Sequence, residues 1–543
     1  RADMIRYTDP RQLKLELFKT PFDTELDKEN RWIKLAEIVP WEELGKTYSK
    51  AMNKEMGRPG IPARVAIGAM IIKHLKNLSD EATIEEIKEN PYLQYFLGYE
   101  DYGIKRAFDP SLFVTIRNRM GFEAFTAFNL ALLNKVNEIK QRQLLLTKTG
   151  KKKKAGKNDF PNSVPPTEQN KETEKEKSEN NETSKEETSK GNQGILLVDA
   201  TVADQKIPYP NDINLLNECR EKCEEIIDSI YPGSGLKKKP RDHRRKARKA
   251  FLNVAKKKNR SLQTIRKGIK QQLNYVRRDI ALIHQLLDKY EGQPFPLKVR
   301  EQRLLWVIHE LFRQQEKMYK EKVHQCEDRI VNIYQPYVRP IVRGKNGRKV
   351  EFGSKVNIGL VDGMTLVSKI SYDAYNESTD LIKQVEAYKS GFGFYPKVLV
   401  TDQLYGTREN RKWLKEKGII YSGKPLGRPP KETEENREEL KETKEQLRKY
   451  QNKRSEIEGK FGQGKNFYGL NKIDARTYST SISWIMATFF GLNIIRALKE
   501  LPYFIFVIFK TWSIKLKTRK MFSEKVESLT FSQLNHAPFL LAA

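Results

Sequence analysis

The chain has 543 residues, with 101 lysines and arginines against 70 aspartates and glutamates, and a formal net charge of +31. This excess favours a polyanionic partner, because each cation placed on a phosphate releases counterions; a generally basic, AT-rich-genome proteome is the alternative. Three cysteines are too few for a disulfide framework or a paired zinc site.

Two features argue against secretion and membrane insertion. The first residues, 1–10, are polar and show no signal peptide. The most apolar run, Tyr503–Phe509, is far shorter than the roughly 20 residues of a membrane helix. We therefore expect a cytoplasmic, nucleoid-associated protein with no membrane partner.

Residues 1–145 are expected to form a mostly helical DNA-binding domain. Pro62–Leu78 carries apolar residues at helical spacing, Ser79 has the side chain of an N-cap, and Phe108–Ser111 opens a third helix. That third helix bears Thr115, Arg117, Asn118 and Arg119. Short helices joined by tight turns suit a helix-turn-helix reader of DNA. A plain helical bundle used for dimer contacts fits the same pattern.

The next two segments differ sharply in composition. Residues 146–193 are charged and almost without apolar side chains, which predicts a disordered linker. Residues 214–345 are predicted to be a helical insertion, in which Leu236–Arg260 has thirteen lysines and arginines among twenty-five residues. A basic arm along DNA is the functional interpretation and a solvated charged face is the alternative. The candidate phosphate contacts are Arg241, Arg244, Arg245, Lys246, Arg248 and Lys249.

Residues 194–213 and 346–500 are predicted to form one α/β domain. Its expected strands are Ile195–Val198, a hairpin of residues 355–361 and 364–370 around Asp362-Gly363, Lys397–Thr401 and Ile419–Tyr421. Ser378 and Thr407 are expected to cap two helices, a helix from about Glu435 carries Glu458, and a last helix covers Ile482–Leu498. This order predicts an RNase H-like mixed sheet covered by helices, with the helical insertion after its first strand.

Two aspartates stand at the predicted ends of two apolar strands. Asp199 follows Val198, and Asp402 follows Thr401. Although a single aspartate at such a position is usually a cap or a turn residue, two neighbouring carboxylates need a cation to neutralise them. Oxygen ligands suit Mg²⁺ or Mn²⁺, and a third carboxylate from a helix would complete a two-metal site.

Three segments carry a resemblance to bacterial insertion-sequence DDE transposases. Residues 195–202 resemble the family's first catalytic motif, residues 398–402 with 405–410 the second, and residues 454–465 the third. Arg454, Glu458 and Lys465 fit the family signature of Tyr, two residues, Arg, three residues, Glu, six residues and Lys. The tyrosine departs from it, because position 451 is glutamine and Tyr450 comes one place early.

The resemblance implies a function and a set of site residues. Asp199, Asp402 and Glu458 would be the catalytic ligands of two divalent metal ions, while Arg454 and Lys465 would hold backbone phosphates. Glu456, the competitor for the third position, lies about 200° around the helix from Glu458.

Such a transposase binds the inverted-repeat ends of its element as double-stranded DNA, cuts them and joins them to target DNA, here as an expected homodimer. A nuclease of the same fold and an inactive DNA-binding relative remain alternatives, and the chain lacks the GxxG loop or aromatic single-strand motif of an RNA-binding protein. Residues 501–543 resemble nothing known to us, and their role is unknown.

Overall fold

The computed structural model describes residues 3–4, 21–52, 58–103, 108–152, 191–342, 350–427, 433 and 436–499. The tail after residue 500 and residues 153–190, most of the predicted linker, lie outside the described residues. Helix α8 (Phe122–Lys152) extends past the predicted start of that linker at residue 146. At its other end, the Gln193 amide donates to the Tyr395 carbonyl at 2.9 Å.

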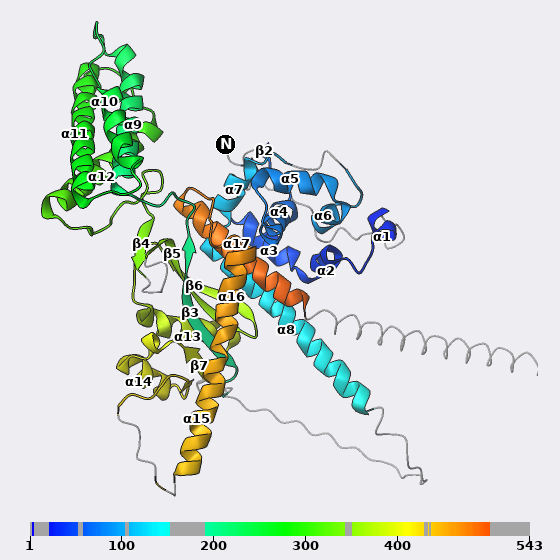
Figure 1. Ribbon diagram of the computed structural model, residues 1–543. Helices are drawn as coiled ribbons and strands as arrows, with labels where there is room; N and C mark the ends of the chain where they lie inside the picture. The colour runs from blue at the N-terminus through cyan, green and yellow to red at the C-terminus, as the bar shows by residue number, and fades with distance from the viewer. Residues whose placement is uncertain are drawn as a thin grey trace, which may run out of the picture.

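A mixed sheet lies at the centre of the molecule (Figure 1), as the sequence predicts. Its strands are β3 (Ile195–Asp204), β4 (Arg339–Val342), β5 (Val350–Val361), β6 (Met364–Ser371), β7 (Val398–Thr401) and β8 (Ile420–Tyr421). The order is β4-β5-β3-β7-β8, with β6 also paired to β5. Strand β3 runs antiparallel to β5 and parallel to β7. The predicted hairpin is confirmed, and its turn residues Asp362 and Gly363 both have positive φ, as a type I′ turn requires.

Strand β3 is longer than the predicted Ile195–Val198, so the prediction that Asp199 ends a strand was wrong. The strand continues because β5 pairs with it as far as Asp204. Gly353 of β5 permits this close approach, since a Cβ there would lie 1.9 Å from the Ala203 carbonyl oxygen. In contrast, pairing with β7 stops at Val198, opposite Thr401. Asp199 therefore lies where β3 loses its β7 neighbour.

Helices cover both faces of the sheet. On one face lie α13 (Leu381–Phe392) and α14 (Arg408–Glu416), whose apolar residues pack with Val198 and Leu399. Thr407 caps α14 as predicted. Ser378 does not cap α13 as predicted: Asn376 caps the short turn η4 (Glu377–Asp380), and Asp380 stands at the N-cap position of α13 without a side-chain cap bond. On the other face lie α16 (Arg454–Phe467) and α17 (Tyr478–Leu498). The single helix expected to carry Glu458 is two, since α15 (Arg437–Asn452) ends just before α16.

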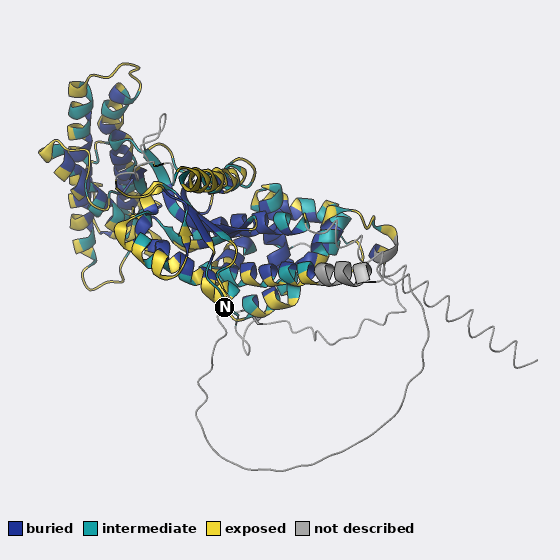
Figure 2. Ribbon diagram, turned by 90° about the horizontal axis from the view of Figure 1, so that it is seen from below, coloured by how far each residue is buried: buried dark blue, intermediate teal, exposed yellow. Residues whose placement is uncertain are grey.

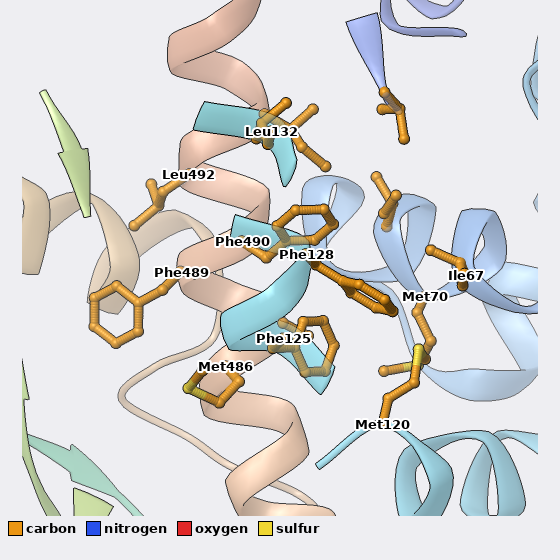
Figure 3. Close-up of a cluster of buried hydrophobic side chains, with 14 of the residues drawn as sticks. Ile67, Met70, Met120, Phe125, Phe128, Leu132, Met486, Phe489, Phe490 and Leu492 are labelled. Carbon is orange, nitrogen blue, oxygen red and sulfur yellow. The ribbon is translucent and has the colours of Figure 1, made fainter. Parts of the chain in front are cut away.

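The N-terminal helices, apart from the first, share a hydrophobic core with the sheet. They are α1 (Pro21–Glu25), α2 (Arg31–Ile38), α3 (Trp41–Ser49), α4 (Ala63–Lys76), α5 (Asp80–Glu89), α6 (Pro91–Phe96) and α7 (Leu112–Arg119), and the two-residue strands β1 (Asp3–Met4) and β2 (Arg58–Pro59) pair beside them. Figure 3 shows Phe490 of α17 facing Phe125 and Phe128 of α8, with ring centroids 5.9 and 5.7 Å apart. Buried residues run from the sheet into these helices (Figure 2).

Helix α17 is long and apolar enough to cross a membrane by composition, which the sequence reasoning overlooked, but 78% of its apolar window is buried inside the protein. Its Asn493 ties three elements together. The Asn493 Nδ2 donates to Asn129 of α8 and to the Thr365 carbonyl of β6, each at 2.7 Å. The helix therefore serves as the core element between the N-terminal helices and the sheet.

Arg117 and Arg119 of α7 face the protein, whereas Thr115 and Asn118 are exposed. Arg117 is buried, pairs with Asp80 and lies over the Trp484 ring. Asn118 accepts a hydrogen bond from Ser479 at 2.8 Å, and Arg119 lies 3.4 Å from the Tyr48 hydroxyl. These contacts favour the bundle interpretation of this helix over that of a base reader; DNA binding by the N-terminal region stays a prediction.

The insertion forms a four-helix bundle with its own core, standing apart from the sheet in Figure 1. Its helices are α9 (Asp212–Ile230), α10 (Arg244–Ala255), α11 (Leu262–Leu287) and α12 (Val299–Glu321), with short turns η2 (Tyr231–Gly233) and η3 (Asp288–Tyr290). Cys219 and Cys223 are buried in this core. The predicted insertion, residues 214–345, overlaps β4, which belongs to the sheet.

Candidate active site

A cavity of about 540 Å³ opens at the edge of β3 that β7 leaves unpaired. Strands β3, β4 and β5, turn η4, the end of β7 and helix α16 contribute its walls. The charged residues that line it are Asp199, Lys355, Glu377, Asp402, Arg454, Glu458 and Lys465. The structure thus brings together all five residues of the three sequence motifs that we expected at the active site.

Strand register places the two aspartates next to each other. Val198 pairs with Thr401, so that Asp199 and Asp402 are the next residues on two adjacent parallel strands. Asp199 Oδ1 accepts the Ala200 N–H at 2.8 Å, and Asp402 Oδ1 accepts the Gln403 N–H at 2.6 Å, capping turn η5 (Gln403–Tyr405). Local backbone bonds therefore orient both carboxylates.

Arg454 lies among the three predicted catalytic carboxylates. Its Nη2 is 3.1 Å from Glu458 Oε1, one helical turn along α16, and its Nη1 is 3.3 Å from Asp402 Oδ1. Its Nε is 3.8 Å from Asp199 Oδ2. The guanidinium, predicted to hold a phosphate, is here the internal cation of the acidic site.

The acidic site disfavours an unneutralised negative charge. The Asp199 side chain is 13% exposed. Burial raises the pKa of Asp199 to about 6, although the Ala200 N–H and Arg454 oppose the rise. Tyr405, fully buried beside it, donates to Asn357 Oδ1 at 3.1 Å, and burial raises its pKa as well. Burial therefore makes the charged form of Asp199 costly, and a nearby cation lowers that cost.

The donor set fits hard divalent cations in its chemistry, because every candidate ligand is a carboxylate oxygen. Among the described residues, no three His, Cys, Asp or Glu side chains stand close enough to ligate an ion. The Arg454 guanidinium lies between the carboxylates and supplies the positive charge that pairs with them. A metal ion held by Asp199, Asp402 and Glu458 therefore requires this side chain to move.

Neighbouring residues of the third motif have other places. Glu456 is exposed and does not line the cavity, so Glu458 is the glutamate of this segment that faces the site. Gln451, where the family has tyrosine, donates to the Ser422 carbonyl at 2.9 Å and to its hydroxyl at 3.0 Å. Lys465, which lines the cavity, has its Nζ 3.9 Å from Glu351. Gln451 thus anchors α15 beside the end of β8.

Sequence reasoning missed two charged residues of the cavity, Glu377 and Lys355, which pair at 2.7 Å. Neither belongs to a recognisable motif. Lys355 was assigned only to the hairpin, and Glu377 stands in an unremarkable polar turn after it. Only the packing of η4 against η5 places Glu377 at the site.

The basic arm lies on the insertion and not in the cavity. Five of its six candidate DNA contacts are exposed, namely Arg241, Arg245, Lys246, Arg248 and Lys249. The sixth, Arg244, pairs with Asp228 at 2.9 Å and with Asp242 at 2.5 Å. Arg244 therefore stabilises the bundle, and the other five remain available to a polyanion.

Comparison with known proteins bears directly on these features. Residues 399–494 match the family described as Transposase DDE domain, which covers Asp402, Arg454, Glu458 and Lys465. Residues 20–119 match the family described as Transposase domain (DUF772). The resemblance to DDE transposases is thereby confirmed by the match at residues 399–494, and the match at residues 20–119 is to a second transposase domain.

A curated relative is known from Rhizobium meliloti. The uncharacterized protein ORF8 in nfe locus is 30% identical to this chain over 117 residues, which are 22% of this chain. The alignment spans 56% of that relative, so this chain covers about half of its length. No solved structure matches the chain.

Proposed function

Because the chain carries two transposase domains, we propose that it is a DDE transposase with an RNase H-like catalytic core, which cuts the ends of its element and joins them to target DNA. One observation carries the proposal: Asp199, Asp402 and Glu458, distant in sequence, line one cavity at an open strand edge. The net charge of +31 supports double-stranded DNA as the partner.

The three carboxylates are proposed to hold two divalent ions, Mg²⁺ or Mn²⁺. Bound ions of this kind activate a water or a 3′-hydroxyl and stabilise the leaving oxygen. The protein supplies the orientation: backbone N–H groups fix Asp199 and Asp402, and α16 presents Glu458. Once the carboxylates are otherwise neutralised, the Arg454 guanidinium is free to pair with a DNA phosphate, as Lys465 on the same helix can.

The remaining partners follow from the same proposal. The exposed lysines and arginines of α10 would contact the phosphates of one DNA segment while the cavity acts on another. A homodimer would bring two element ends together, and work on chromosomal DNA places the protein at the nucleoid in the cytoplasm. The match at residues 20–119 supports a role of the N-terminal helices in binding DNA ends.

Metal-dependent cleavage tests the proposal. The purified chain is incubated with a plasmid carrying its gene and flanking DNA, with Mg²⁺, Mn²⁺ or chelator. We expect cuts at discrete flanking positions that require metal and are lost in Asp199→Asn, Asp402→Asn and Glu458→Gln. Glu456→Gln, exposed on the same helix outside the cavity, is the matched control and should cut normally.

The products separate the alternatives. Joined products in a strand-transfer assay indicate a transposase, whereas cutting without joining indicates a nuclease of the same fold. DNA binding without cutting under any metal would leave an inactive DNA-binding relative.

A further inference from the structure

Glu377 is a fourth carboxylate in the wall of the cavity. It is the first residue of η4, and its side chain is 18% exposed. It lies outside the three motifs and outside both matched segments, residues 20–119 and 399–494. Nothing but its position in the fold therefore relates it to the other acids.

The backbone around Glu377 is fixed to the backbone that follows Asp402. Asn410, buried in α14, donates through Nδ2 to the Ser378 carbonyl at 2.8 Å and to the Tyr405 carbonyl at 2.9 Å. Ser378 follows Glu377, and Tyr405 ends the turn that Asp402 caps. The Asn410 amide thus joins the turn that contains Glu377 to the turn that Asp402 caps. Such a link between rigid elements fixes the position of functional side chains.

Lys355 is the cation that neutralises Glu377. Its Nζ is 2.7 Å from Glu377 Oε1 and 2.9 Å from the Tyr375 carbonyl. Glu377 and Asp199 both line this cavity, and both are largely buried in its wall. The two acids therefore share one electrostatic environment.

Charge balance distinguishes four acids from three. Asp199, Asp402 and Glu458 share the guanidinium of Arg454, and Glu377 has its own cation in Lys355. Two divalent ions bring four positive charges, which four carboxylates match and three do not. Arg454 and Lys355 are thus paired with the four acids, while Lys465, the third cation of the cavity lining, lies 3.9 Å from Glu351.

We infer that Glu377 is a fourth metal-binding carboxylate of this site, acting with Asp199 and Asp402, and that Lys355 is the counter-ion it releases when a divalent ion binds. This inference rests on the proposed function. It adds a residue that the three motifs do not supply, and it gives Lys355 a role as a cation set free at the edge of the site, where it can pair with a DNA phosphate.

The inference is tested by measuring Mn²⁺ binding to the full chain with calorimetry, at pH 7.5 and without DNA. Glu377→Gln should weaken binding at one of the two ions by about tenfold or more, because removing even a group that only supports a metal ligand costs about 10- to 100-fold in affinity. Lys355→Met removes the competing cation and should tighten binding. Thermal unfolding of each variant in the presence of chelator reports whether the variant folds.

Asp380→Asn is the matched control. Asp380 ends the same turn η4, is 8% exposed and pairs with Lys369 at 3.0 Å, but does not line the cavity. Its variant should bind Mn²⁺ like the wild type. Equal weakening in Glu377→Gln and Asp380→Asn would reduce Glu377 to a structural role and overturn the inference.

The outcomes also separate this inference from the proposed function. Wild-type binding that Asp402→Asn abolishes and Glu377→Gln leaves unchanged would overturn the role of Glu377 alone. Absence of Mn²⁺ binding by the wild type would overturn the metal site itself and the role of Glu377 with it.

Discussion

Replacing Arg454 by glutamine should tighten metal binding while impairing DNA cleavage. The guanidinium contacts three carboxylates at 3.1, 3.3 and 3.8 Å. Breaking a fully buried ion pair costs about 3–5 kcal/mol and an exposed one about 0–1 kcal/mol. Arg454 is 28% exposed and its partners 13–57%, so we expect its contacts to contribute about 1–2 kcal/mol.

A divalent ion must displace this interaction in order to bind. Without it, the apparent Mn²⁺ affinity should rise about 5- to 30-fold, since 1.4 kcal/mol corresponds to tenfold. Calorimetry measures the affinity, and the melting temperature in chelator should fall as the carboxylates lose their cation. Lys453→Gln changes the exposed cation next in sequence and should leave both quantities unchanged. Weaker or unaltered Mn²⁺ binding by Arg454→Gln would refute the argument that this side chain holds the place of the metal.

Three further predictions concern the rest of the fold. Burial raises the pKa of Asp279 in the insertion to about 6, so the folded chain binds that proton more tightly than the unfolded chain and loses stability as pH rises from about 4 to about 6. In urea unfolding, Asp279→Asn should therefore raise the free energy of unfolding by up to about 3 kcal/mol at pH 8 and by little at pH 4. An equal gain at both pH values would contradict this reasoning. Asn493→Ala leaves buried polar groups of α8 and β6 without hydrogen-bond partners and should lower the free energy of unfolding by about 2–3 kcal/mol in the same assay. An unchanged free energy would show that water or another side chain replaces the Asn493 amide. Four exposed cations of α10 are Arg245, Lys246, Arg248 and Lys249. Replacing all four by glutamine should lower the slope of log Kd for DNA against log salt concentration by up to about 3.6. An unchanged slope would show that α10 does not contact DNA phosphates.

Local signals in the sequence predicted local structure well. The Asp362-Gly363 turn predicted its hairpin because few residue pairs tolerate two positive φ values. Thr407 predicted the start of α14. The three motifs predicted which acids meet in one cavity, because Val198 and Thr401, the residues before the two aspartates, pair in parallel.

Features that depend on tertiary contacts escaped the same reasoning. The extension of β3 past Asp199 is determined by β5, a strand about 150 residues away along the chain. Glu377 reaches the site only because Asn410 joins two turns, and no local pattern marks that bond. Arg117 is a residue type that commonly contacts DNA, but it is buried against Trp484 and Asp80. In each case a partner remote in sequence decides which way the side chain faces.

Helix α17 explains why the two matched segments act as one structure. It packs on α4, α7 and α8 on one side and on β6 and α16 on the other. Gly464 of α16 lies against Leu492 of α17 and Leu470, with room for little more than a Cβ, so that α16 cannot shift without disturbing the core. Helix α16 carries Arg454 and Glu458, whereas β3 carries Asp199 and Asp402 directly follows β7. The packing of the N-terminal helices on α17 therefore helps to fix the distance between the two halves of the acidic site. The strongly apolar composition of α17 follows from this position, since it meets hydrophobic side chains on both sides.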